Sequence, residues 1–186
     1  MAQTGYSIGQ RFGLVSDGLF NTNEELANRP YNDFVANRQT LGDIKYKDLD
    51  GDGIINQNDI CPIGFPNYAQ YHFNLKAQCA WKGFDLKILF TGLANGSFYL
   101  SDVMTNPFFK YVGNAWKWQY DGRWTPERYA AGEKITFPRA TYAYDAKANN
   151  YLVSDYWMAS TNHIKLKNIE FGYTFNVKRG LLNRLQ

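Results

Sequence analysis

Residues 48–59 (DLDGDGIINQND) hold the densest group of potential metal ligands in this sequence. Their order matches the calcium-binding loop of an EF-hand, in which oxygen ligands recur at fixed positions and a glycine at the sixth permits a sharp turn. The seventh position contributes a backbone carbonyl, and the twelfth is an aspartate here rather than the usual, longer glutamate. The pattern predicts a structural Ca²⁺ site with the ligands Asp48, Asp50, Asp52, Ile54, Asn56 and Asp59.

The segments on either side of this calcium-type loop exclude a complete EF-hand. Residues 44–47 before it alternate apolar and polar side chains, as a strand does. Residues 61–66 after it (CPIGFP) contain two prolines, which a regular helix does not accommodate. A calcium sensor must move two flanking helices, so we expect a static clip instead. A plain Asx-rich turn without a metal is the alternative.

No other group of residues in the sequence predicts catalysis. There is no Ser/His/Asp or Cys/His grouping and no glycine loop of the phosphate-binding kind, and the carboxylates outside the calcium-type loop form no acid–base pair. His72 and His163 are isolated, on or beside polar strand positions. We therefore expect that the protein is not an enzyme.

The composition favours an all-β protein with large loops. Aromatic residues make up 17% of the 186 residues, and helical periodicity is scarce. The 20 basic and 17 acidic residues nearly balance, which argues against a nucleic-acid partner. No stretch approaches the roughly 20 apolar residues of a transmembrane helix. Transmembrane strands are shorter and alternate, so a hydrophilic average does not exclude them.

Two alternating runs predict a β-hairpin over residues 71–91, with a short turn at 81–83. Each run has about nine residues, the length that a tilted strand needs to cross a bilayer. Aromatic residues near both ends resemble the girdles of membrane barrels. A soluble sheet with one face packed on a core has the same period, so both interpretations stay open here.

The sequence from residue 92 to 162 predicts a long loop region, rich in Gly, Asn, Tyr and Trp. Its aromatic cluster could stack on sugar rings, although packing in an aromatic girdle or within the loops is the simpler expectation for most members, which are Trp116, Trp118, Tyr120 and Trp124. The short turn at 81–83 would lie at one end of the strands. The loop region at 92–162 and the calcium-type loop would lie at the other end. Outer-membrane barrels have this asymmetry of short turns and long loops.

Alternation resumes in a predicted strand over residues 163–175. Its apolar phase slips between Leu166 and Ile169, and a β-bulge near Asn168 would account for the slip. The two cysteines, Cys61 and Cys79, could form a bridge, but their spacing does not decide this. Cys79 falls on the apolar side of the hairpin, which favours a buried thiol.

Several motifs occur in a characteristic order: GLF at 18–20, GDIKYKDLDGDGIIN at 42–56, IG at 63–64, WKGFDL at 81–86, WTPE at 124–127, FPR at 137–139 and LKNIEFGY at 166–173. Together they resemble the C-terminal part of the SusC/RagA-type TonB-dependent outer-membrane transporters of Bacteroidota. The resemblance covers about residues 5–176. It departs from the family at Arg128, where asparagine is usual, and at Lys165, where arginine is usual.

The resemblance implies that residues 1–186 are the C-terminal portion of a receptor, namely several antiparallel strands of a plugged β-barrel of the 22-stranded type with long extracellular loops. It implies location in the cell outer membrane and import of oligosaccharides or peptides. It also implies two protein partners, a SusD-like surface lipoprotein that covers the barrel and TonB, contacted through the N-terminal part of the parent protein. The alternative is a soluble secreted β-domain that binds calcium and carbohydrate without transport.

Overall fold

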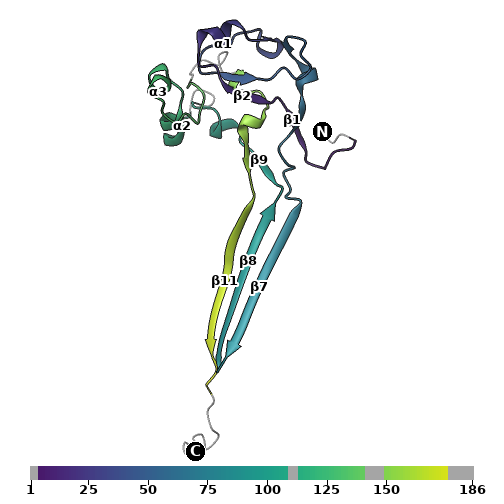
Figure 1. The fold of residues 1–186 in the computed structure, drawn as a ribbon, viewed down its shortest axis with the longest axis vertical. Coiled ribbons are helices and arrows are strands. Elements are labelled where there is room, and N and C mark those ends of the chain that lie inside the picture. Colours follow the sequence, from purple (N-terminus) through teal and green to yellow (C-terminus); the bar gives the residue numbers. More distant parts are fainter. Residues whose placement is uncertain (1–3, 109–112, 141–148, 176–186) are drawn as a thin grey trace, which may run out of the picture. The chain divides into compact units, whose positions relative to one another are not determined.

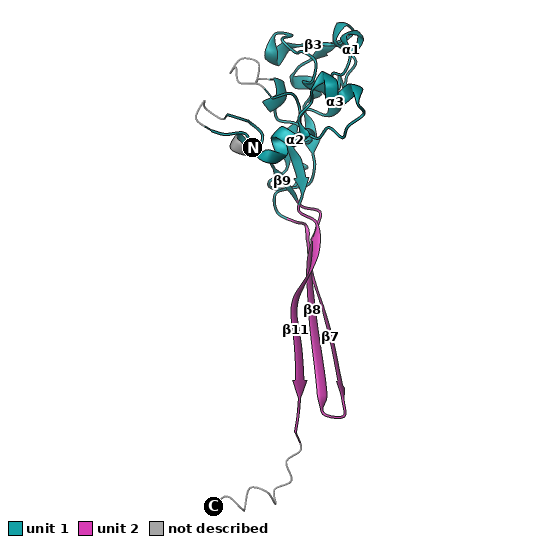
Figure 2. Ribbon diagram, turned by 90° about the vertical axis from the view of Figure 1, so that its left-hand side faces the viewer, with its two compact units in different colours: residues 1–68, 97–160 teal, residues 69–96, 161–186 magenta. Residues whose placement is uncertain are grey.

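The computed structural model describes residues 4–108, 113–140 and 149–175 (Figure 1). The chain divides into two units, coloured separately in Figure 2. Unit 1 comprises residues 1–68 and 97–160, and unit 2 comprises residues 69–96 and 161–186. Unit 1 is therefore assembled from two segments of the chain that are far apart in the sequence.

Unit 2 is a three-stranded antiparallel sheet in the order β11–β8–β7. β7 (Tyr71–Trp81) and β8 (Phe84–Ala94) form the hairpin expected at residues 71–91, and β8 runs three residues beyond that range. β11 (His163–Tyr173) pairs with the other edge of β8. The sheet is open, and no barrel closes among the described residues.

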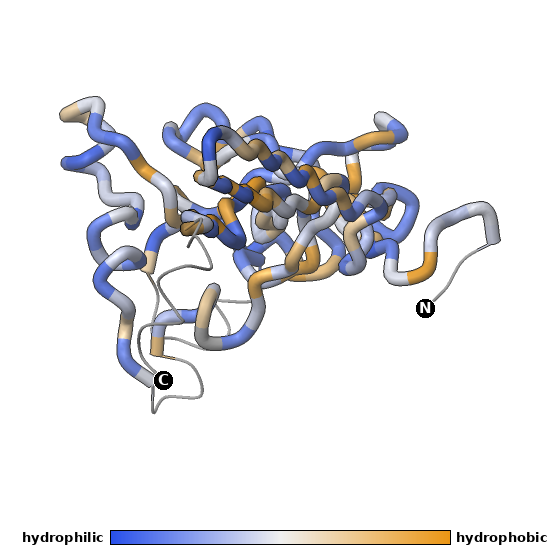
Figure 3. The backbone as a smooth tube through the Cα atoms, turned by 90° about the horizontal axis from the view of Figure 1, so that it is seen from below, coloured by the Kyte–Doolittle hydropathy of each residue, from blue (hydrophilic) through white to orange (hydrophobic). Residues whose placement is uncertain are grey.

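Cross-strand register sorts the side chains of unit 2 by polarity. Residues directly opposite one another share a face of a sheet, as do Leu75, Phe90 and Leu166 in one such row. Hydrophobic and hydrophilic residues therefore alternate along these strands (Figure 3). We call the two sides the apolar face and the polar face. The apolar face consists of Tyr71, Phe73, Leu75, Ala77, Cys79, Trp81, Phe84, Leu86, Ile88, Phe90, Gly92, Ala94, Ile164, Leu166, Ile169, Phe171 and Tyr173.

The predicted β-bulge near Asn168 is confirmed, since the register of β11 shifts between Leu166 and Asn168. Lys167 is the extra residue. Side chains in a strand alternate with a period of two, so without an inserted residue Ile169 and Phe171 would turn to the opposite face from Leu166. The bulge thus keeps β11 apolar on one side along its whole length.

Nothing in the described part of unit 2 covers the apolar face. Leu75 is 62% exposed and Phe171 is 71% exposed. The expectation of a buried thiol at Cys79 is wrong for this chain, because the sheet has no second layer within its unit and Cys79 is exposed. Cys61 and Cys79 are both free, so the bridge left open by the sequence does not form.

Unit 1 is built from short paired strands and short helices. Its two-stranded sheets are antiparallel with one exception, the parallel pair β3–β5. The pairs are β1 (Arg11–Gly13) with β6 (Cys61–Ile63), β2 (Ser16–Leu19) with β4 (Ile44–Tyr46), β3 (Tyr31–Asn32) with β5 (Ile54–Ile55), and β9 (Ser97–Tyr99) with β10 (Met158–Ser160).

The described α-helices of unit 1 have five or six residues, and side chains cap the first and the third. Thr22 caps the first and forms a capping box with Glu25, and Thr125 caps the third, which begins with Pro126. No helix among the described residues is long and apolar enough to cross a membrane. The α-helices are α1 (Asn23–Ala27), α2 (Lys117–Gly122) and α3 (Pro126–Ala130), and the 3₁₀ helices are η1 (Asp33–Val35), η2 (Gln57–Asp59), η3 (Asp102–Met104), η6 (Asn149–Tyr151) and η7 (Asp155–Trp157).

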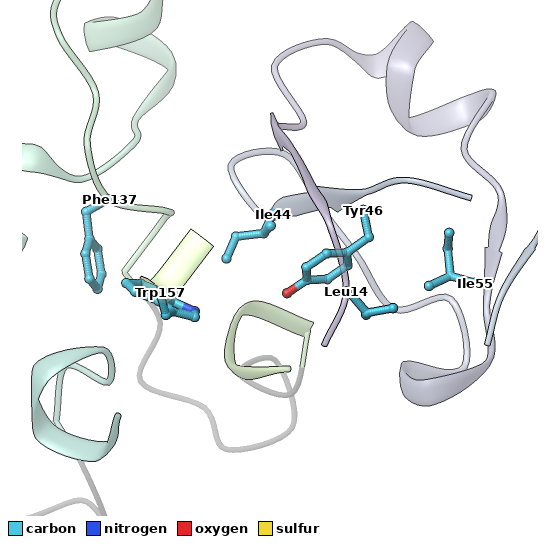
Figure 4. Close-up of a cluster of buried hydrophobic side chains, with 6 residues drawn as sticks. All are labelled: Leu14, Ile44, Tyr46, Ile55, Phe137 and Trp157. Carbon is cyan, nitrogen blue, oxygen red and sulfur yellow. The ribbon is translucent and has the colours of Figure 1, made fainter. Parts of the chain in front are cut away.

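The core of unit 1 joins its two segments. It contains Leu14, Ile44, Tyr46 and Ile55 from the first segment and Phe137 and Trp157 from the second (Figure 4). The long loop region expected at residues 92–162 is therefore not a free loop. It contains β9, β10, α2, α3 and three of the 3₁₀ helices, and it supplies two of the large side chains of this core.

A buried polar network crosses the same boundary. The carboxylate of Asp43, which is fully buried, accepts hydrogen bonds from Nε of Arg139 (2.6 Å) and Nδ2 of Asn150 (2.8 Å). The Oδ1 of Asn150 accepts from the backbone N–H of Ile44 at 2.8 Å, and the hydroxyl of Tyr46 donates to the carbonyl of Asn149 at 2.6 Å. Burial raises the pKa of Tyr46, so this hydroxyl stays a donor.

Replacing Arg139 with Met should destabilise unit 1 by about 3 kcal/mol, because it leaves the buried carboxylate of Asp43 without its cation. The measurement is the urea midpoint of unfolding, monitored by tryptophan fluorescence, since Trp124 and Trp157 are buried in this unit. The control is Lys117→Met, which removes a cation from the exposed pair with Asp121 and should leave the midpoint nearly unchanged. Equal midpoints for the two variants would contradict the structural role of the network.

Candidate metal centre

The calcium-type loop is anchored to the core of unit 1 from within. β5 lies inside the loop and pairs with β3, and the N–H of Tyr31 donates to the carbonyl of Gly53 at 2.9 Å. Ile55, at the eighth position of the loop, is 2% exposed and belongs to the hydrophobic core. Successive side chains of an extended segment point to opposite sides, so Ile54 is exposed while Ile55 points into the core and anchors the loop.

Three of the predicted ligands converge on one point. Ligand oxygens of Asp48, Asp50 and Asp52 all lie within 4.8 Å of one another. Each of these carboxylates also accepts a backbone N–H of the loop: Asp48 Oδ2 from Gly53 at 2.7 Å, Asp50 Oδ1 from Asp52 at 3.2 Å and Asp52 Oδ1 from Ile54 at 2.7 Å. These hydrogen bonds fold the chain around the three carboxylates. The negative charges of the carboxylates repel one another.

The loop needs glycine at two positions for conformational reasons. Gly51 and Gly53 have φ angles of 76° and 83°, in the left-handed region that other residues rarely adopt. A Cβ at either position would meet no atom within 4 Å. Backbone conformation, and not lack of space, therefore explains the glycine at the sixth position of the calcium-type loop.

Backbone hydrogen bonds lower the pKa of Asp48. The largest cause is the N–H of Gly53, and the N–H of Gly51 acts in the same direction. A carboxyl group whose pKa is lowered by folding stabilises the folded loop above the ordinary aspartate pKa, and this contribution is lost as the pH falls through the lowered value. Asp48 therefore stays ionised, and able to bind a cation, in mildly acidic solution.

Ile54 and Asn56 lie beside this group. The side-chain nitrogen of Asn56 donates to Oδ2 of Asp52 (3.3 Å) and to the carbonyl of Ile54 (3.4 Å). Its own oxygen accepts from the N–H of Asn58 at 2.7 Å. The amide thus links two oxygens that the sequence assigns to the cation, the Asp52 carboxylate and the Ile54 carbonyl.

Asp59 stands apart from the three converging aspartates. It is fully buried, and its two oxygens accept the N–H groups of Leu49 (2.6 Å) and Asn56 (2.8 Å). These bonds join the second, ninth and twelfth positions of the loop. The structure thus gives Asp59 a role in closing the loop, and each carboxylate oxygen retains a further lone pair for a metal.

The donor set fits a hard divalent cation. All of the converging atoms are oxygens, and three carboxylates with a neighbouring carbonyl match the ligands that Ca²⁺ prefers. The loop lacks the two helices of an EF-hand, since β4 precedes it and β6 follows it. A cation held here would reduce the repulsion among the carboxylates and make the loop rigid, without moving helices.

A hollow of about 680 Å³ beside this loop is a feature that the sequence reasoning missed. Asp48 and Gly53 of the calcium-type loop line it, together with Lys45 and Lys47 of the preceding segment. Nζ of Lys45 forms ion pairs with Asp17 (3.5 Å) and Glu25 (3.3 Å). The alternation at residues 44–47 could have indicated this hollow. In a strand it turns Lys45 and Lys47 away from the buried side chains of Ile44 and Tyr46.

The aromatic cluster of the second segment divides in two. Trp124 is buried and its Nε1 donates to Oδ1 of Asn21 at 2.9 Å, so it packs within the fold. Trp116, Trp118 and Tyr120 are between 47% and 60% exposed. Trp118 lies edge-on to the ring of Phe137, with 5.6 Å between centroids. The surface therefore presents three of the four predicted aromatic side chains.

The described residues define a mostly β protein that carries an EF-hand-type acidic loop without EF-hand helices. No protein-family model matches the chain. Over 150 residues, 76% of this chain, the sequence is 27% identical to TonB-dependent receptor P26 of Formosa agariphila. The match covers 13% of that receptor, so the chain spans a small part of the length of this relative. The chain is thus distantly similar to a TonB-dependent receptor.

The chain should take up a single calcium ion in titration calorimetry, because three carboxylates converge in the loop. Replacing Asp48 and Asp52 together with Ala should abolish the uptake and also the rise in unfolding temperature that calcium produces by mass action. Asp33→Ala is the control, since it removes an exposed carboxylate outside the loop and should bind calcium as the parent chain does. Uptake that persists in the double variant would place the metal elsewhere.

Proposed function

We propose that these residues form part of a TonB-dependent outer-membrane receptor of the SusC/RagA type that imports oligosaccharides or peptides. Unit 2 supplies strands of the barrel wall, and unit 1 supplies extracellular loops ordered around the calcium-type loop. The bound metal is Ca²⁺, and its role is structural. TonB, acting on the N-terminal part of the parent receptor, supplies the energy, and a SusD-like surface lipoprotein covers the barrel.

The apolar face of unit 2 is the observation that carries this proposal. Soluble monomers rarely expose contiguous apolar surface on this scale. Three strands of 11 residues have the length that tilted strands need to cross a bilayer, and each alternates between lipid and interior positions as barrel strands do. A bilayer would bury the side of the sheet that no described residue of the unit covers.

Aromatic side chains gather on the apolar face at its turn end, as they do in the interfacial girdles of membrane barrels. The ring of Phe84 lies 5.7 Å from that of Phe171 and 4.5 Å from that of Tyr173, between centroids. Nζ of Lys82 lies 4.7 Å above the ring of Trp81. This pairing of an aromatic ring with a basic tip suits the boundary between lipid and water.

The similarity to a TonB-dependent receptor supports the same assignment, although it covers a small part of that protein. The ordered motifs of the sequence add the finer type, SusC/RagA, and with it the nutrient class and the lipoprotein partner. The sequence similarity and the apolar face support the assignment independently. The first depends on sequence identity, and the second depends on which side chains share a face of the sheet.

The alternative function, a soluble secreted domain that binds calcium and carbohydrate, draws on unit 1 alone. The exposed rings of Trp116, Trp118 and Tyr120 favour it, since flat aromatic surfaces suit the apolar faces of sugars. Fractionation of the native protein separates the two functions. A receptor component sediments with the outer membrane and needs detergent for extraction, whereas recovery from the medium without detergent would refute the membrane assignment.

Leu75→Lys should weaken association with lipid vesicles by about 2–4 kcal/mol, because it places a charge near the middle of the apolar face. Flotation with zwitterionic vesicles measures the bound fraction. The matched control is Gln78→Lys, which adds the same charge to the polar face of the same strand and should leave flotation unchanged. Equal losses in the two variants would mean that the apolar face does not meet lipid.

A further inference from the structure

The polar face of unit 2 contains a hollow of about 270 Å³ at the end of the sheet away from the turn. Two rows of the sheet form it. His72 and His163 lie opposite the same residue of the central strand, Leu93, and Asn74 and Lys165 lie opposite Thr91. The polar side chains that line the hollow are His72, Asn74, Thr91, His163, Lys165 and Lys167.

The β-bulge gives this hollow an additional cation. Lys167, the extra residue of β11, lines the hollow together with Lys165, and its insertion returns Ile169 and Phe171 to the apolar face. The residue whose insertion preserves the apolar face is therefore itself a lysine, and it lines the hollow with Lys165.

The hollow carries positive charge without a matching acid. Among the described residues that line it, none is acidic, and no ion pair joins Lys165 or Lys167 to a described carboxylate. The acid further along the same face, Glu170, is already engaged by Nζ of Lys87 at 3.5 Å and by Nδ2 of Asn168 at 2.7 Å. The remaining acid of the polar face, Asp85, lies beside the turn at the opposite end.

Neutral donors complete the set. Asn74 has an amide and Thr91 a hydroxyl, both able to donate to an anion. His163 holds its ring through Nδ1, which lies 2.8 Å from the carbonyl of Thr161. Since a carbonyl only accepts, Nδ1 is the donor in that bond and Nε2 of the neutral ring is an acceptor, so Asn74 and Thr91 are the neutral donors of the hollow.

We propose that this hollow binds the oxyanionic group, carboxylate or phosphate, of a small ligand. Lysine recognises such groups as a point charge, and the absence of an arginine fork among the lining residues indicates recognition by charge with neutral donors. The volume lies near the lower limit of about 300 Å³ for ligand pockets, which suits a single small group and not a macromolecule.

Binding itself needs only the three strands of unit 2. Its consequence for transport rests on the proposed function, because in a barrel the polar face of these strands lines the interior. There the site would favour acidic ligands over neutral ones along the import path. The proposed function by itself does not specify the charge of the ligand.

The test is calorimetric titration of the chain, in nonionic detergent at low ionic strength, with three probes: inorganic phosphate, glucuronate and glucose. We expect phosphate, glucuronate or both to bind, glucose not to bind, and added sodium chloride to weaken the binding. Replacing Lys165 and Lys167 with Gln should weaken it by about tenfold or more. Absence of binding for both anions, or glucose binding equal to that of glucuronate, would overturn the proposal.

The matched control is the double variant Lys82→Gln with Lys134→Gln, which removes two exposed lysines outside the hollow and should change affinity by less than about twofold. An equal loss in this control would reduce the effect to net charge and overturn the site. Flotation of the Lys165/Lys167 variant reports separately on the proposed function. It should match the parent chain, because neither lysine belongs to the apolar face.

Discussion

The buried carboxylate of Asp43 is the constraint on which unit 1 depends. A charge removed from water must be paired and hydrogen-bonded, and its partners here are Arg139, Asn150 and the N–H of Thr40. Arg139 and Asn150 lie about a hundred residues away in the sequence, in a region that looks like a loop. The hydrogen bonds of Asp43 therefore hold that region against the first segment, where Phe137 and Trp157 complete the hydrophobic core.

The calcium-type loop is attached to the same network. Ile55 reaches the core from the middle of the loop, and the short parallel pair β3–β5 joins the loop to Asn32. The side chain of Asn32 in turn donates to Asn149 at 3.4 Å. A cation in the loop would therefore rigidify a part of the protein that is already packed on the core. This arrangement suits a structural clip better than a sensor, which needs an element that can move.

Unit 2 follows the opposite principle, since its three strands have no core of their own. Its order comes from backbone pairing and from the separation of polar and apolar side chains on two faces. A single inserted residue, Lys167, maintains this separation and lines the hollow of the polar face with Lys165. The two faces then meet different surroundings. In the function proposed above, one face meets lipid and the other meets the ligands that pass through a barrel.

The sequence by itself determined the features that depend on near neighbours along the chain. These are the alternation of the three long strands, the bulge at Lys167 and the spacing of the converging aspartates, because strand period and Asx turns act over two to five residues. Only the tertiary structure decided the pairing of Asp43 with Arg139, the burial of Trp157 and the closing role of Asp59. These contacts join positions whose local patterns carry no mark of their partners. The exposure of Cys79 has the same origin, because alternation shows which residues share a face and not what covers it.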